Sequence, residues 1–302
     1  MSGIELSPAW TLIFGAALVP LLRGLARKVW VLALPIAGLV QLWLLAPGEY
    51  GQFAFLGEEL LLLRVDRWSQ LFGLIFLIAA LVSAIYSLHV RDAVQQTAGL
   101  SYAGAAIGAV FAGDLLTLFV FWELTAVTSV FLIWARGTER AWRAGMRYIL
   151  IQLVSGMLLL FGALQQLAAT GSLRFEHLGL DAPGGMLIFL AFGIKCAFPL
   201  LHNWLQDAYP EATETGTVFL SAFTTKLAVY ALARGYAGTP ELIWIGAAMT
   251  AFPIFYAVIE NDLRRVLAYS LNNQLGFMMV GIGIGTELAL NGTAAHAFSH
   301  IL

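Results

Sequence analysis

A lysine lies in the middle of a long apolar stretch of this chain, and a helix-breaking residue follows it. Lys195 lies within the run 184–201, and Pro199 comes four residues later. The proline ring clashes with the carbonyl of residue 195 and supplies no N–H, so we expect the helix to break there. His202 follows Lys195 by seven residues and would lie on roughly the same face if the helix resumed. In a membrane, an ionisable group at this depth is costly and usually marks a path for ions or protons.

Four more ionisable residues lie in apolar stretches elsewhere in the chain. Glu123 lies in TLFVFWELTAVTSVFLIW, Lys226 lies in FLSAFTTKLAVYALAR, and His296 and His300 lie one helical turn apart in AAHAFSHIL. Burial disfavours the charged form of a side chain, and an opposite charge nearby restores it. Histidine needs only a small shift to titrate near neutral pH. Groups of this kind, linked by water, can relay protons, so we interpret these four residues and Lys195 as a candidate proton relay.

Buried charges can also serve purely to hold helices together. A single Glu–Lys pair would fit that role, but each further charge costs about 2.5–3.5 kcal/mol or more at the bilayer centre, so the whole set favours a relay. The pair His296 and His300 lacks the additional ligands that zinc requires. Bis-histidine haem needs a partner helix with its own His, and His89 and His177 lie at loop edges. The sequence predicts no metal or cofactor, and its single cysteine, Cys196, excludes a disulfide within the chain.

Polar residues near these groups are candidates for supporting roles. Asn203, Gln206 and Asp207 follow the proline, and we expect this stretch to line a cavity. Gln274 belongs to the polar part of VLAYSLNNQLGFMM; such residues either hold water or hydrogen-bond helices together, and the sequence favours neither role. The arginines between residues 136 and 147 are interpreted first as a topology signal, with contact to another protein of a complex as the alternative.

Composition indicates an integral membrane protein with an all-α fold. The 302 residues are 60% hydrophobic and only 11% charged, whereas soluble domains are about half apolar and a quarter charged. A net charge of −2 and the lack of a basic domain give no basis for nucleic-acid binding. The N-terminal residues MSGIELSPAW lack the basic region of a cleavable signal peptide, so we expect a retained helix there.

About eleven transmembrane helices are predicted from apolar runs. The last run is shorter than the roughly twenty residues that span a bilayer, so we expect the sequence to be a fragment of a longer protein. Lys and Arg residues in alternate loops number ten on one side and four on the other, which predicts a cytoplasmic first side and an N-terminus outside. The predicted runs are 5–22, 29–46, 68–88, 97–112, 114–134, 148–169, 184–204, 215–234, 240–259, 264–284 and 287–302.

Four motifs resemble one family of membrane proteins. DLLTLFVFWELTAVTS, GIKCAFPLLHNWLQDAYPEA, TTKLAVYALAR and NDLRRVLAYSLNNQLGFM occur in the same order in antiporter-like subunits of respiratory complex I and of Mrp-type Na⁺(K⁺)/H⁺ antiporters. The resemblance covers roughly residues 65–302. It implies that Glu123 is the fifth-helix glutamate paired with Lys195, that Lys226 is the connecting lysine, and that His296 and His300 join two half-channels.

The resemblance also implies a fold of inverted five-helix repeats, each with a broken helix. Residues 1–92 would hold helices one to three, residues 93–236 the complete first repeat with its broken seventh helix, and residues 237–302 a second repeat that is truncated. The second broken helix of the family would then be absent from this sequence.

The function that this resemblance implies is proton translocation in a multisubunit monovalent cation (Na⁺ or K⁺)/H⁺ antiporter, as its D-type subunit. The alternative is a proton-pumping membrane subunit of NADH:quinone oxidoreductase (complex I) or of a related hydrogenase, and a non-transporting assembly scaffold is a third possibility. The implied partners are other membrane subunits, protons with Na⁺ or K⁺, and the lipid bilayer. The implied location is the bacterial inner (plasma) membrane.

Overall fold

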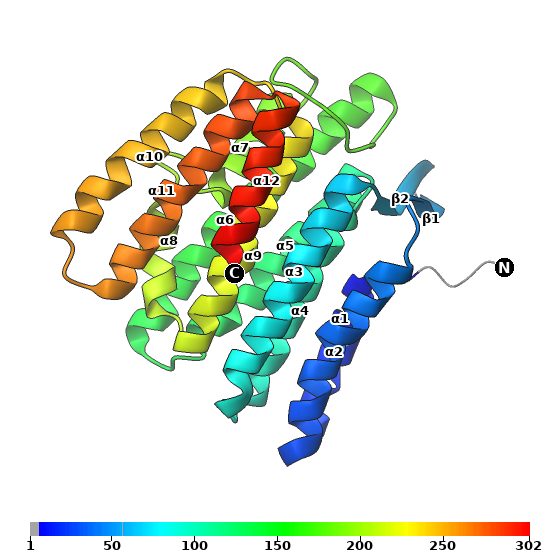
Figure 1. Ribbon diagram of the computed structural model, residues 1–302. Helices are drawn as coiled ribbons and strands as arrows, with labels where there is room; N and C mark the ends of the chain where they lie inside the picture. Colours follow the sequence, from blue (N-terminus) through cyan, green and yellow to red (C-terminus); the bar gives the residue numbers. More distant parts are fainter. Residues whose placement is uncertain (1–5, 56) are drawn as a thin grey trace.

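The computed structural model describes residues 6–55 and 57–302, and most of them are helical (Figure 1). A helix lies at each of the eleven predicted runs, although residue 5, where the first run was expected to begin, lies outside the described residues. The α-helices are α1 (Pro8–Ala17), α2 (Gly24–Leu44), α3 (Arg67–Tyr86), α4 (Ala93–Phe111), α5 (Leu115–Trp134), α6 (Glu139–Thr170), α7 (Gly185–Lys195), α8 (Asn203–Ala208), α9 (Glu214–Gly235), α10 (Glu241–Ile259), α11 (Leu263–Ile284) and α12 (Glu287–Ile301); short 3₁₀ turns are η1 (Val19–Leu21), η2 (Ser87–His89) and η3 (Tyr209–Glu211).

Helix lengths follow capping residues as well as apolar content. Helix α6 begins at Glu139, ahead of the predicted start at 148, because the Thr138 side chain accepts the Ala141 N–H and caps an amphipathic first turn. Helix α5 begins after Asp114, whose carboxylate accepts the Thr117 N–H. This cap separates α4 from α5 at the place where the sequence predicts the division.

Six of the described helices are long and apolar enough to cross a membrane. They are the helical spans Gly24–Leu44, Arg67–His89, Leu115–Trp134, Glu139–Thr170, Glu214–Gly235 and Glu241–Ile259. Two further apolar helices, Pro8–Leu21 and Gly185–Lys195, are shorter. The finer count of eleven crossings therefore remains a prediction.

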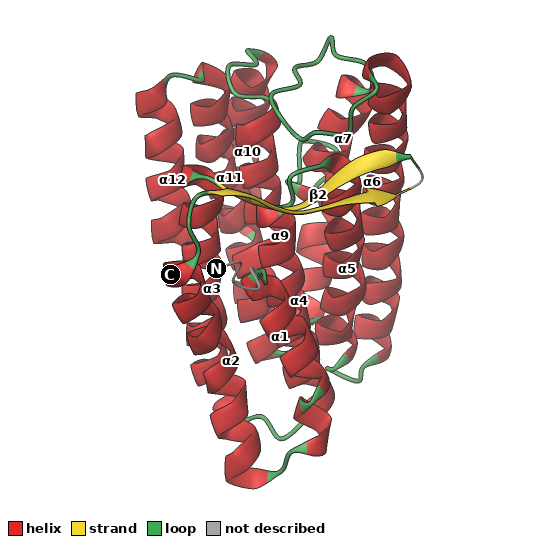
Figure 2. Ribbon diagram, turned by 90° about the vertical axis from the view of Figure 1, so that its right-hand side faces the viewer, coloured by secondary structure: helices red, strands yellow, loops and turns green. Residues whose placement is uncertain are grey.

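A β-hairpin, which the all-α prediction did not include, connects α2 to α3. Strand β1 (Gly48–Phe55) pairs antiparallel with β2 (Glu58–Val65), and Figure 2 shows the hairpin crossing one face of the helices. The leucines of β2 are mostly buried, whereas β1 is mostly exposed. Asp114 accepts the Leu61 N–H at 2.8 Å, and Gly113 donates to the Leu61 carbonyl at 3.0 Å. The hairpin forms because β2 packs on the helices and hydrogen-bonds to the α4–α5 turn. Such a tertiary interaction leaves no signal in the pattern of apolar residues along the chain.

Helix α9 lies at the centre of the bundle. It packs against α3, α4, α5, α7, α11 and α12. In its most apolar stretch, 83% is buried inside the structure. Helices α10 and α11 form an antiparallel pair on one flank, and α1 and α2 lie on the other (Figure 1). In the same view the hairpin and the α6–α7 loop lie toward the upper right, and the α5–α6 and α10–α11 turns lie toward the lower left.

The helix that carries Lys195 is broken where the sequence predicts. Helix α7 ends at Lys195, and α8 begins only at Asn203, with Pro199 between them. Ala197 (φ 61°) and Leu200 (φ 70°) adopt the left-handed region, which costs a residue with a β-carbon about 1–2 kcal/mol. The indole N–H of Trp204 donates to the Ile194 carbonyl at 2.9 Å and so satisfies an acceptor at the end of α7.

Candidate functional site

Lys195 is fully buried at the end of α7 and is bound by helix α5. Its Nζ donates to the Trp122 carbonyl at 3.0 Å and to Thr125 Oγ1 at 2.7 Å. The same nitrogen lies 4.4 Å from the centroid of the Trp122 ring, a cation–π distance. Two oxygen acceptors and an aromatic face therefore hold the amine, as a buried ionisable group requires.

Trp122 also fixes the position of α7. Its indole N–H donates to Ser155 Oγ on α6 at 3.0 Å, and the Ser155 hydroxyl donates to the Ala191 carbonyl on α7 at 2.7 Å. Ala191 precedes Lys195 by one helical turn. A closed ring of contacts thus joins α5, α6 and α7 around the lysine; Figure 2 shows where these three helices lie in the bundle.

Glu123 lies next to this ring without direct contact to the lysine. None of the ion pairs among residues 6–55 and 57–302 joins Glu123 to Lys195. The Oε1 atom is buried and has no hydrogen-bond partner among the described side chains and backbone. The carboxylate lies against Gly156 of α6. The expected Glu–Lys pair is therefore not a direct ion pair: Lys195 bonds to the carbonyl of Trp122, the residue before Glu123.

The remaining candidate relay residues lie on α9 and α12. Lys226 is fully buried, and its Nζ donates to the Ser221 carbonyl at 2.8 Å. His296 Nε2 lies 2.8 Å from Gln274 Oε1, and the His296 and His300 ring centroids are 6.4 Å apart on one face of α12. The structure therefore brings Gln274 to His296, while Lys195 and Lys226 each bond to other partners.

A cavity of about 390 Å³ reaches this second group. It lies between α9, α11 and the end of α12 and is lined by Glu214, Thr217, Val218, Ser221, Arg264, Leu267, Ser270, Leu271 and His300. Ser221, whose carbonyl holds Lys226, and His300 therefore share one cavity. The space exceeds the volume of several water molecules, at about 30 Å³ each.

Two residues predicted to support the relay have other contacts. The helix does not continue from Lys195 to His202, so their seven-residue spacing does not place them on one helix face; the His202 ring packs on Phe252 of α10, with centroids 4.7 Å apart. Asp207 forms a bidentate ion pair with Arg147, at 2.6 and 2.8 Å. The arginine thus ties α6 to α8 within the chain.

Sequence reasoning missed a cluster of buried hydroxyls beside the relay. Ser129 Oγ lies 2.7 Å from the Tyr148 hydroxyl, and the Thr224 N–H donates to the Tyr102 hydroxyl at 2.7 Å. The Tyr209 hydroxyl donates to the Leu220 carbonyl at 2.8 Å. Single hydroxyl residues in apolar helices give no spacing signal, so only the packed structure identifies this cluster.

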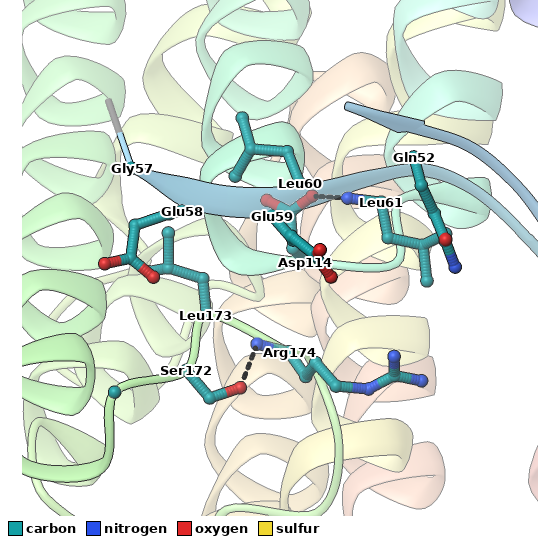
Figure 3. Close-up of a pocket in the computed structure, with 11 residues that line it drawn as sticks. Gln52, Gly57, Glu58, Glu59, Leu60, Leu61, Asp114, Ser172, Leu173 and Arg174 are labelled. Atoms are coloured by element: carbon teal, nitrogen blue, oxygen red, sulfur yellow. Dashed lines mark hydrogen bonds between the residues drawn. The ribbon is translucent and has the colours of Figure 1, made fainter. Parts of the chain in front are cut away.

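An acidic pocket at the hairpin is separate from the relay residues (Figure 3). Its volume is about 300 Å³, and Figure 3 shows Glu58, Glu59, Asp114 and Arg174 among its lining side chains. Asp114 is occupied by the Leu61 and Thr117 N–H groups, and Arg174 pairs with Glu49 and Glu176. These contacts give Asp114 and Arg174 a structural role.

Charges at the start of α3 stabilise the same end of the bundle. Burial alone would raise the pKa of the Asp66 carboxyl, but the Arg234 guanidinium and the Ser69 N–H lower it more, so the pKa lies below its ordinary value. Arg234 lies 2.8 Å from Asp66 Oδ2.

In the described ranges, no three His, Cys, Asp or Glu side chains are grouped so that they could hold a metal ion.

Comparison with known proteins gives this arrangement a family. Residues 112–302, more than half of the chain, match the family described as NADH:quinone oxidoreductase/Mrp antiporter, TM. The chain belongs to this family. Together with its apolar helices, membership in the NADH:quinone oxidoreductase/Mrp antiporter family makes the chain an integral membrane protein.

Relatives from both branches of the NADH:quinone oxidoreductase/Mrp antiporter family are similar to the chain. The N subunit of the NADH-quinone oxidoreductase of Desulforudis audaxviator is 32% identical over 76% of this chain and 52% of its own length. The D-type subunit of the Na(+)/H(+) antiporter of Alkalihalophilus pseudofirmus is 29% identical over 65% of this chain and 43% of its own length. The chain thus spans about half the length of these relatives.

Solved structures share the fold over nearly the whole chain. A chain of the membrane-bound sulfane sulfur reductase, an archaeal respiratory membrane complex, gives a TM-score of 0.86 at 24% identity, covering 98% of this chain and 54% of that one. A chain of the Mrp complex from a Dietzia species gives 0.79 at 22% identity, covering 98% and 61%. A chain of respiratory complex I from Thermus thermophilus gives 0.82 at 23% identity, covering 97% and 67%.

Proposed function

We propose that the chain is part of a proton-translocating subunit of a multisubunit monovalent cation (Na⁺ or K⁺)/H⁺ antiporter, similar to the D-type subunit. The observation that carries this proposal is Lys195, a fully buried amine at the end of a broken helix in a chain of the antiporter family. Protons would pass from Lys195 to Lys226 and on to His296 and His300, and Glu123 would tune the proton affinity of Lys195.

A second candidate is a proton-pumping membrane subunit of a complex I-like oxidoreductase. It is favoured by the similarity to two NADH-quinone oxidoreductase proteins, the N subunit of Desulforudis audaxviator and the M subunit of Pseudomonas aeruginosa, whose match covers 92% of this chain. Proton movement driven by a Na⁺ or K⁺ gradient in the absence of NADH supports the antiporter. Movement that requires NADH and quinone supports the oxidoreductase.

The proposed setting follows from the same family. We propose eleven membrane crossings, with residues 93–236 as the first inverted repeat and residues 237–302 as the start of the second. The N-terminus would face the outside of a bacterial inner membrane, and other membrane subunits of the complex would be the partners. Support comes from the helices at all eleven predicted runs and from the broken helix α7–α8.

Replacing either charge of the first pair tests the relay. We expect Lys195→Ala and Glu123→Ala, each in the complete complex in membrane vesicles, to abolish cation-dependent dissipation of a pH gradient, because each removes one titratable group. Lys28→Ala is a matched control, since it removes an exposed positive charge. Normal transport by an assembled Lys195→Ala complex would disprove the relay.

The carboxylate itself is tested by conservative changes. Glu123→Asp should reduce transport less than Glu123→Gln, because only aspartate keeps a titratable group. The initial rate of pH-gradient dissipation measures both. Native rates in both variants would show that charge at position 123 is not used.

A further inference from the structure

The Glu123 carboxylate occupies space that exists only because residue 156 is glycine. A β-carbon at position 156 would overlap Oε1 and Cδ of Glu123 and would lie 3.2 Å from its Cγ. Real β-carbons do not approach other heavy atoms this closely, so any side chain at position 156 must displace the carboxylate. The acidic group of α5 therefore lies directly on the backbone of α6.

The two other glycines of α6 have a different environment. At Gly162 a β-carbon would meet Ile188 Cγ1 at 2.5 Å and the Gly184 carbonyl at 2.9 Å, which are contacts of helix packing. At Gly145 it would meet the Trp134 ring. Within α6, the glycine at 156 is thus the one whose free space is filled by an ionisable side chain.

The helices around this position are held in place. Trp122, which precedes Glu123, donates to Ser155, which precedes Gly156, at 3.0 Å, and Ser155 is bound in turn to α7 at Ala191. Because these bonds fix the approach of α5 to α6, an added methyl group at position 156 would move the flexible Glu123 side chain rather than the helices. Glu123 is only partly buried, which leaves room for its side chain to rotate outward.

We propose that Gly156 is a positioning residue that sets the place of the Glu123 carboxylate beside Lys195. The two charges do not touch, so their interaction depends on the distance between them and on the solvent exposure of the carboxylate. Displacing the carboxylate from Gly156 changes that interaction without removing either charge. The effect on transport rests on the proposed relay, whereas the position of the carboxylate does not.

A double substitution tests this proposal, because it should reverse which residue at position 123, glutamate or aspartate, supports faster transport. In the native background, we expect Glu123→Asp to lower transport. In a Gly156→Ala background, aspartate has no atom at the position of Glu123 Oε1, where the overlap with the new methyl group is greatest. We therefore expect Gly156→Ala/Glu123→Asp to transport faster than Gly156→Ala alone. We expect Gly156→Ala to lower the rate about tenfold or more, since a misplacement of 1 Å can cost a catalytic site this much. Alanine favours the helix by about 1 kcal/mol over glycine, so a simple helix effect would act in the opposite direction.

Gly162→Ala, alone and with Glu123→Asp, is the matched control, and aspartate should not restore its transport.

Infrared titration of the Glu123 carboxyl band gives a readout that does not need transport. The band is assigned by its loss in Glu123→Gln, and Gly156→Ala should move the midpoint of its titration. If Glu123→Gln transports normally, the relay fails while a moved band still supports the role of Gly156. An unmoved band, or a rescue by aspartate that is equal in both glycine backgrounds, overturns the inference. Should Gly156→Ala prevent assembly, recovery of assembly in the double variant supports the inference and its failure overturns it.

Discussion

The hydrogen bonds of Lys195 match a lysine that can change its protonation state. An ammonium has three N–H donors, whereas a neutral amine has two and a lone pair. The structure gives Nζ two acceptors, the Trp122 carbonyl and Thr125 Oγ1. Both forms can keep these two bonds, so in the proposed relay the proton would be gained or lost in the third direction on nitrogen. The two bonds would therefore hold the amine in one place during the proposed proton transfer.

Thr125 is consequently predicted to matter for transport. Thr125→Val keeps the shape but removes an acceptor from Lys195, so we expect the rate to fall about tenfold, which corresponds to ~1.4 kcal/mol. Thr125→Ser should stay near the native rate. Thr128→Val is the control, because the Thr128 hydroxyl bonds only its own helix. A native rate for an assembled Thr125→Val complex would contradict this role.

Asp66 is predicted to make stability depend on pH. Its pKa is lowered in the folded protein, so its contribution is present above the unfolded value of about 3.9 and is lost as pH falls through the lower folded value. Asp66→Asn keeps an N-cap but removes the charge that binds Arg234, and we expect a loss of ~1 kcal/mol at pH 7.

The measurement is thermal unfolding in detergent at several pH values. The difference between native protein and Asp66→Asn should be full at pH 7 and should shrink below pH ~4. Asp92→Asn is the control, since Asp92 caps α4 and forms none of the ion pairs within the described ranges. A difference that does not change with pH would contradict the assignment of the effect to the carboxylate charge.

The broken helix α7–α8 combines a predictable feature with an unpredictable one. Pro199 in an apolar run predicts that the helix breaks, because that rule is local. The conformation of the break is not local. Ala197 and Leu200 adopt positive φ angles, although neither residue type favours them, because Trp204 and the ends of both helix pieces are fixed by packing.

Strain at Leu200 gives a prediction for this element. Its side chain is 90% exposed, so Leu200→Gly loses little packing and relieves the left-handed conformation. We expect stabilisation by ~1 kcal/mol, measured as a higher unfolding temperature of the purified protein. Leu200→Ala keeps the β-carbon and should give no such gain. A destabilised Leu200→Gly variant would show that the side chain, and not the backbone angle, determines stability here.

Over the whole molecule, local sequence patterns predict where the helices lie, whereas the contacts between side chains of different helices depend on how the helices pack. The helix positions, the break and the histidine face follow from local periodicity. The hydrogen-bond acceptors of Lys195 lie about seventy residues earlier in the chain. The contact of the Glu123 carboxylate with Gly156 depends on how α5 and α6 align. Sequence spacing carries no information on such contacts. The β-hairpin was missed for the same reason.

The orientation of the molecule can be tested with two exposed glutamates near opposite ends. Glu139 starts α6 on the arginine-rich side, and Glu176 lies in the α6–α7 loop on the other; their side chains are 75% and 63% exposed. In a Cys196→Ser background, a membrane-impermeant thiol reagent added outside cells should label Glu176→Cys and not Glu139→Cys. The reverse labelling would place the N-terminus in the cytoplasm.

The single cysteine of the chain lies in the broken helix, directly after α7. Cys196 follows Lys195, is buried in the break, and lies 3.7 Å from the Met279 sulfur on α11. Modification of this buried thiol by a permeant reagent requires the side chains that cover it to move apart. A comparison of the modification rate with and without a proton gradient would test whether the surroundings of Cys196 open during transport in the unmodified protein.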